Sequence, residues 1–114
     1  MTREELKCKQ LLKKLVNQNA KIIEKVAKKA QRGNYEEMTE YFDDVCDVKI
    51  TIDGNFRYCS AVIQLAFGGP NIYFDSAVSE VRGVWGGLKF EKVVDFAACD
   101  AVNDYFEDYY ESHR

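Results

Sequence analysis

The first thirty-three residues carry the longest periodic pattern of apolar positions in the chain. Apolar side chains recur there at three- and four-residue intervals, which predicts one long amphipathic helix. Thr2 and Glu5 form a capping box at its start, and Gly33 is the stop signal at its end. We expect its apolar face to comprise Cys8, Leu11, Leu12, Leu15, Val16, Ile22, Ile23, Val26 and Ala30.

A second, short amphipathic helix is predicted directly after Gly33. Asn34 is a favourable N-cap, and Glu37 follows three residues later. Met38, Tyr41, Phe42 and Val45 would share its apolar face.

The pattern then changes to short β-branched and aromatic runs separated by turn residues. Asp53-Gly54-Asn55 is a hairpin signal, and Gly68-Gly69-Pro70-Asn71 is the strongest turn in the chain. We interpret the Gly68 turn as structural rather than phosphate-binding, because no helix and no lysine follow it. The runs predict an antiparallel meander of strands at residues 47–52, 56–67, 72–74 and 81–85, with 88–94 as a fifth, edge strand.

The last element is predicted to be a helix from an Asp95 cap to about Glu111. Its apolar stripe would be Ala98, Val102, Tyr105, Phe106 and Tyr109. The fold class is therefore α+β: a long N-terminal helix, a short helix, a four- or five-stranded antiparallel meander, and a C-terminal helix packed on the sheet. We expect a single domain in which residues 1–33 form a basic helix and residues 34–114 an acidic body.

Charge separates these two parts sharply. Residues 1–32 hold ten Lys or Arg against three Glu, a net charge of +7. The remaining residues hold six basic and sixteen acidic side chains, a net charge of −10. The overall charge of −3 thus conceals an asymmetry that indicates charged partners.

The cations of the first helix gather on one side, which we call the basic ridge. They fall within an arc of roughly 60° opposite the apolar face. The ridge is a solvated face, a surface for a nucleic-acid backbone, or a contact for the acids of a second copy. Asn19, within the apolar face, is either a partly exposed residue over a gap or a position that fixes register in a helix pair. The basic ridge comprises Arg3, Lys7, Lys14, Lys21, Lys25, Lys28 and Arg32.

Two acidic ridges repeat one spacing in the rest of the chain. Like charges four residues apart cost a helix about 0.2–0.5 kcal/mol per pair, so the ridges are either solubilising faces or binding surfaces. In the second case they would imitate the phosphates of a nucleic acid and occupy a basic channel, with Tyr105, Tyr109 and Tyr110 at the contact. The C-terminal ridge comprises Asp100, Asp104, Glu107, Asp108 and Glu111, and the second ridge Glu36, Glu40, Asp43, Asp44 and Asp47.

Motifs for catalysis, cofactors and metals are missing from the chain. It has no nucleotide-binding glycine loop and no nucleophile elbow, and its only histidine is His113. The four cysteines form no Cys-x-x-Cys pair, so we expect free, partly buried thiols and no zinc site. We expect a protein that is not an enzyme and uses no cofactor.

The single tryptophan, Trp85, has two interpretations. It is either a core aromatic residue or an exposed anchor at an interface.

No stretch of about 18 apolar residues and no signal-peptide pattern occurs, so we expect a cytoplasmic protein without a membrane partner.

Three segments of the chain carry a resemblance to known proteins. They are Gly68 to Asp75, Trp85-Gly86-Gly87 and the acidic, aromatic segment Cys99 to Tyr110. These segments resemble small accessory proteins carried by mobile elements of Firmicutes. Some of these are anti-CRISPR proteins directed against type II-A effector nucleases. The resemblance covers roughly residues 46–110, excludes the first helix and transfers no catalytic residue.

The resemblance implies a non-enzymatic inhibitor that binds the effector nuclease or its guide RNA and blocks complex assembly or DNA binding. The C-terminal acidic ridge and its tyrosines would contact the nuclease, while the basic ridge would compete for guide RNA or hold a second copy. An alternative is a nucleic-acid-binding accessory protein of a plasmid or integrative element, acting through the ridge from Lys14 to Arg32. A further alternative is a homodimerisation module that pairs through its first helix.

Overall fold

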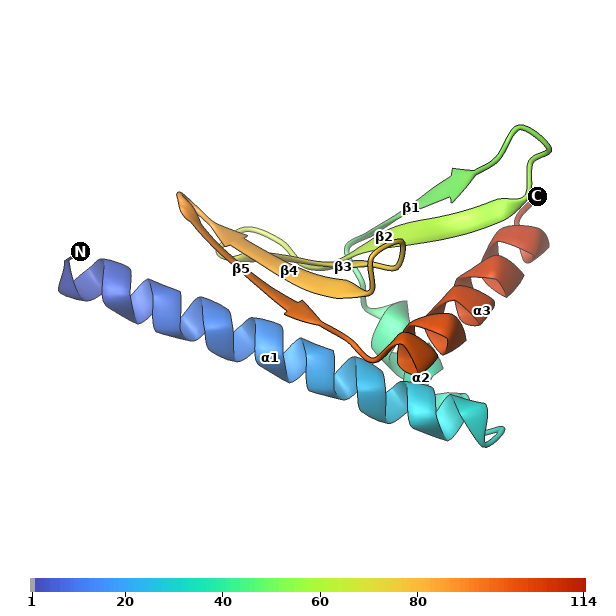
Figure 1. Cartoon of the computed structure of the whole chain (residues 1–114), viewed down its shortest axis with the longest axis horizontal. Coiled ribbons are helices and arrows are strands. Elements are labelled where there is room, and N and C mark those ends of the chain that lie inside the picture. The colour runs from blue at the N-terminus through green and yellow to red at the C-terminus, as the bar shows by residue number, and fades with distance from the viewer. Residues whose placement is uncertain (1) are drawn as a thin grey trace.

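Five strands form one antiparallel sheet in which every strand pairs with its neighbour in the chain (Figure 1). The computed structural model describes residues 2–114. The strand order is β1-β2-β3-β4-β5, so the predicted meander is confirmed, with β1 and β5 at its edges. The strands are β1 (Asp47–Ile52), β2 (Tyr58–Ala66), β3 (Asn71–Asp75), β4 (Glu80–Trp85) and β5 (Leu88–Val93).

The two faces of the sheet differ in polarity because side chains alternate along each strand. One row across the sheet pairs Ile63 with Phe74 and Phe74 with Val81, all three buried. The next row pairs Tyr73 with Arg82 and Arg82 with Glu91 on the other face. The apolar face is the one that the helices cover (Figure 1).

Helix α1 (Arg3–Gln31) runs beneath the sheet and contacts β4 and β5 (Figure 1). Its predicted ends are confirmed: the Thr2 hydroxyl accepts a hydrogen bond from the Glu5 amide at 3.1 Å, and Gly33 has a φ of +93°. The amides of Gly33 and Asn34 donate to the carbonyls of Ala30 and Lys29, which closes the last turn.

The buried stripe of α1 is narrower than predicted and slightly rotated. Leu12, Val16, Ile23, Val26 and Ala30 are buried as expected, together with Ala20 and Ala27. Leu11 and Ile22 were placed on the apolar face, yet they are 41% and 40% exposed. They lie at the flank of the stripe, beyond the line along which the helix rests on the sheet.

Helix α2 (Glu36–Asp43) and helix α3 (Phe96–Ser112) complete the layer. Tyr35, rather than Asn34, occupies the N-cap of α2, although the Asn34 side chain still accepts from the Glu36 amide at 3.2 Å. The Asp95 cap is confirmed, since its carboxylate accepts from the Ala97 amide at 3.3 Å. Helix α3 packs against α1 and β2, where Val102 and Phe106 are buried.

One hydrophobic core joins the basic and acidic parts of the chain. Residues from α1, α2, α3 and the strands belong to the same buried cluster. The boundary near residue 33 is therefore a change of charge, while packing is continuous across it.

Candidate functional site: an acidic groove and a basic ridge

Two adjoining hollows lie where α2, α3 and the start of β1 meet. The first hollow has a volume of about 490 Å³, and its lining includes Tyr35, Asp104, Asp108 and Ser112. The second has a volume of about 380 Å³, and its lining includes Phe42, Asp43, Asp47 and Val48. Both are also lined by Tyr105 and Tyr109. We call this surface the acidic groove, because Asp43, Asp47, Asp104 and Asp108 border it and none of its lining side chains is cationic.

Aromatic rings line the acidic groove: Tyr105 and Tyr109 line both hollows, and Phe42 and Phe106 line the second hollow. The Phe42 ring lies 4.9 Å from that of Phe106 and 5.6 Å from that of Tyr105, measured between centroids. Burial raises the pKa of the Tyr105 hydroxyl, and the nearby Asp43 carboxylate raises it further. The hydroxyl is therefore protonated at neutral pH and adds no charge to the groove.

The C-terminal acidic ridge is exposed along its whole length, and the fold divides it in two. Asp104 and Asp108 face the acidic groove, whereas Asp100, Glu107 and Glu111 do not line it. Glu111 also forms an ion pair with Arg114 at 3.2 Å. Within residues 2–114, α3 thus offers two acids toward the groove, and two acids without an ion pair that do not line it.

The second acidic ridge was predicted on one helix face, and this is wrong beyond Asp43. Helix α2 ends there, Asp44 is its C-cap, and Asp47 is the first residue of β1. The chain leaves the helix because the Cys46 amide bonds to the Gln64 carbonyl at 2.8 Å and strand pairing begins. Glu36 and Glu40 are exposed outside the acidic groove.

The three predicted tyrosines have different surroundings. Tyr109 is 41% exposed and stacks on the His113 ring at 4.3 Å. The Tyr110 hydroxyl donates to the Phe56 carbonyl at 2.8 Å, so this residue joins α3 to the β1–β2 turn and does not line the groove. Sequence reasoning missed Tyr35, which is 51% exposed at the groove, because an isolated aromatic residue in a turn carries no periodic signal.

The basic ridge on α1 is exposed throughout, as predicted. None of its seven cations joins an ion pair in residues 2–114, although Lys29, next to the ridge, bonds to Glu37 at 2.6 Å. Asn19 is partly buried and accepts a hydrogen bond from Tyr41 of the same chain. Its polar role is therefore intramolecular, between α1 and α2.

The remaining predicted features are structural. All four cysteines are free, but Cys46 and Cys59 are exposed, contrary to the expectation of partial burial. Gly68 to Asn71 forms a turn in which the Gly68 amide donates to the Asn71 side chain at 2.9 Å. Trp85 is half-buried against the core and lies close to Gly69.

Residues 2–114 contain neither a candidate metal site nor a helix able to span a membrane. No group of three or more His, Cys, Asp or Glu side chains in this range is placed to hold a metal ion. Within the same range, no helix combines the length and apolar character needed to cross a bilayer.

Comparison with known proteins gives no family to which the chain can be assigned. A scan of protein-family models finds no match, and neither a search of curated proteins nor one of solved structures finds a similar chain.

Proposed function

We propose that this protein is a non-enzymatic inhibitor that binds a basic, nucleic-acid-binding channel of a partner protein through its acidic groove. The supporting observation is that Asp43, Asp47, Asp104 and Asp108 come from three elements and border two adjoining hollows that share Tyr105 and Tyr109. Carboxylates bind the arginine and lysine side chains that otherwise hold phosphates. Tyr109 adds an exposed aromatic contact of the kind that contributes strongly at protein interfaces.

The resemblance of residues 46–110 to accessory proteins of mobile elements supports a type II-A CRISPR effector nuclease as the partner. Asp47, Asp104, Asp108 and Tyr109 lie inside that range. A groove that imitates phosphates would compete with guide RNA or target DNA for the channel of the nuclease. The protein would thereby block complex assembly or DNA binding without any chemical step.

The test compares two pairs of substitutions on the same helix. Asp104→Asn with Asp108→Asn removes two charges from the acidic groove. Asp100→Asn with Glu107→Gln removes two charges from the part of the ridge that does not line it. Both pairs change exposed side chains, so both variants should fold.

Inhibition of DNA cleavage by a type II-A effector nuclease is measured over a range of inhibitor concentrations. We expect the groove pair to weaken inhibition at least tenfold and the control pair to leave it within about twofold, since loss of one desolvated charge contact costs about 2–5 kcal/mol. An equal loss of inhibition in both variants would show that inhibition depends on net charge alone and not on the acidic groove. Absence of inhibition by the unaltered protein would remove this nuclease as the partner.

A further inference from the structure

We infer that the basic ridge of α1 is a binding site for the backbone of a double-stranded nucleic acid. The ridge runs from Arg3 to Arg32, which corresponds to about 43 Å of helix. Its seven cations are exposed and free of ion pairs within residues 2–114. A long row of one sign of charge matches the uniform charge of a duplex.

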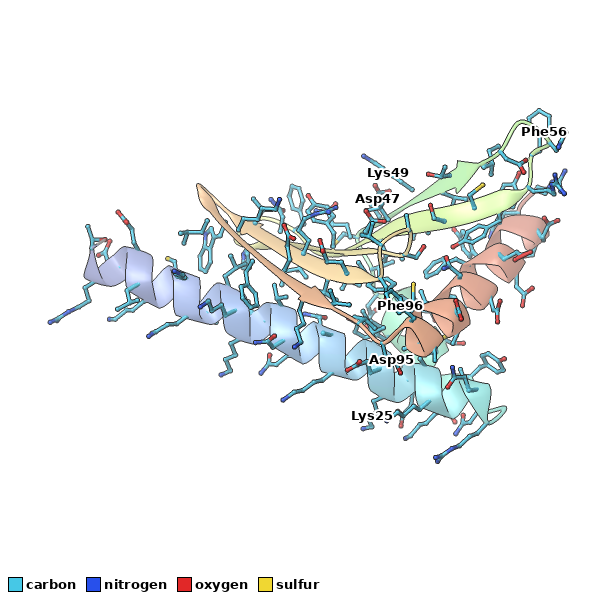
Figure 2. All side chains as sticks on the ribbon, in the orientation of Figure 1. Lys25, Asp47, Lys49, Phe56, Asp95 and Phe96 are labelled. Atoms are coloured by element: carbon cyan, nitrogen blue, oxygen red, sulfur yellow. The ribbon has the colours of Figure 1, made fainter. Side chains whose placement is uncertain are left out.

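The opposite side of α1 packs against the rest of the chain, so the ridge faces outward. Seven residues of that side are buried, and the helix contacts β4, β5, α2 and α3. Figure 2 shows the Lys25 side chain pointing away from the sheet, beneath the helix. The hydrogen bond from Lys29 lowers the pKa of the Glu37 carboxyl in α2, and Lys25 lies near enough to lower it further, but Glu37 forms its ion pair with Lys29, outside the ridge.

The other side chains on this face distinguish between duplex and single-stranded ligands. Gln10, Asn17 and Gln18 lie on or beside the ridge and supply amide donors for phosphate and sugar oxygens. Helix α1 contains no aromatic residue, whereas surfaces that bind single strands stack successive bases on aromatic rings. No acid of α1 falls within the arc of the ridge; Glu24 lies beside it and accepts from the Asp95 amide at 3.0 Å.

The test measures the binding of a fluorescent DNA duplex of about 20 base pairs and mixed sequence, which is longer than the ridge. Anisotropy titrations between about 50 and 200 mM NaCl give the slope of log K against log salt. The unaltered chain should show a slope steeper than about −4, because each neutralised phosphate contributes about −0.9. A single-stranded oligonucleotide of equal length should compete poorly.

Two charge-matched variants locate the site. Lys21→Gln with Lys25→Gln alters the ridge, and Lys49→Gln with Lys89→Gln alters exposed lysines of β1 and β5. Figure 2 shows Lys49 on the sheet, away from α1. The ridge pair should reduce the magnitude of the slope by about 1.8, while the control pair leaves it unchanged. Lysine and glutamine have similar helix propensities, so α1 should remain folded.

Three results would overturn the inference: no duplex binding at about 50 mM NaCl, equal loss of slope in both variants, or equal competition by the single strand. Self-association at low salt in place of duplex binding would instead assign the ridge to a second copy. The inference does not depend on the acidic groove, and the Asp104→Asn, Asp108→Asn variant should bind the duplex at least as tightly as the unaltered protein.

Discussion

The Tyr41 hydroxyl donates a hydrogen bond to Asn19 Oδ1 at 2.5 Å and so ties α2 to α1. Asn19 in turn donates from its amide to the Leu15 carbonyl at 2.9 Å. Burial raises the pKa of Tyr41 well above its usual range, which keeps the hydroxyl protonated as a donor. Asn19, a polar side chain within the apolar face of α1, is therefore satisfied from inside the molecule.

Replacing Asn19 should be costly because it leaves that hydroxyl without a partner. We expect Asn19→Ala to lower the free energy of unfolding by about 1–3 kcal/mol, measured by urea denaturation. Tyr41→Phe in the same background should add little further loss. Strictly additive effects of the two substitutions would contradict the proposed coupling.

The packing of α1 on β4 leaves no room for a side chain at Gly83. A Cβ atom there would lie 2.6 Å from both Leu12 Cδ1 and Val16 Cγ2, and both of these residues are buried. Gly83→Ala should destabilise the fold by about 1–3 kcal/mol through overpacking. Gly87→Ala is the control, since nothing lies within 4 Å of its Cβ position, and its effect on urea denaturation should be small. Equal stability of the two variants would refute this account of the α1–β4 contact.

Phe56 occupies a position better suited to asparagine or glycine. Its φ is +61° in the β1–β2 turn, and its side chain is 62% exposed. Phe56→Asn should raise the free energy of unfolding by about 0.5–1 kcal/mol, because asparagine tolerates the left-handed region. Phe67→Asn is the matched control: Phe67 is 79% exposed without a positive φ, so no gain is expected. A gain in both variants would point to surface hydrophobicity instead of backbone strain.

Stability should decrease in alkaline solution. Burial raises the pKa of Tyr58 to about 12, compared with about 10 in an unfolded chain, and its hydroxyl donates to Asn103 at 2.6 Å. The folded state thus holds this proton more tightly than the unfolded chain does. Tyr58 therefore contributes fully to the free energy of unfolding below about pH 10, and this contribution is lost as the pH rises through about 12. Urea denaturation at about pH 8, 10, 11 and 12 measures the effect. Tyr58→Phe should have a shallower dependence, and an unchanged dependence would contradict the assignment to Tyr58.

The four thiols should react at different rates with a thiol reagent. Cys46 and Cys59 are exposed and should react first, while Cys8 is half-buried and should follow. Cys99 is buried, its thiol donates to the Ser76 carbonyl at 3.2 Å, and burial raises its pKa. It should react only in denaturant, because the thiolate is the reactive form. Cys46→Ser with Cys59→Ser should remove the fast phase, and reaction of Cys99 in the native protein would contradict its burial.

Most helix and strand boundaries could be predicted from the sequence, because their signals are local. Thr2, Gly33 and Asp95 set helix ends through hydrogen bonds and backbone angles within a few residues. The predicted range 47–52 for β1 agrees with the structure, and the edge strand at residues 88–94 differs only in its last residue.

Other features depended on contacts between distant segments. Leu11 and Ile22 belong to the apolar periodicity, yet only the position of the sheet decides which part of that face is buried. Asp47 continues the acidic spacing of α2, yet pairing with β2 places it in a strand. In each case tertiary contact overrode a local pattern.

The sequence by itself determined the charge of the two parts, the exposed basic ridge and the order of the elements, since periodicity and caps depend on neighbouring residues. Only the tertiary structure decided which acids lie on the same surface. Helix α3 returns to pack on β2 with Phe106 against Phe42, and the hollow bordered by Asp104 and Asp108 adjoins the one bordered by Asp43 and Asp47. The acids of the two segments are more than fifty residues apart in the chain, so no local pattern records that they share a groove.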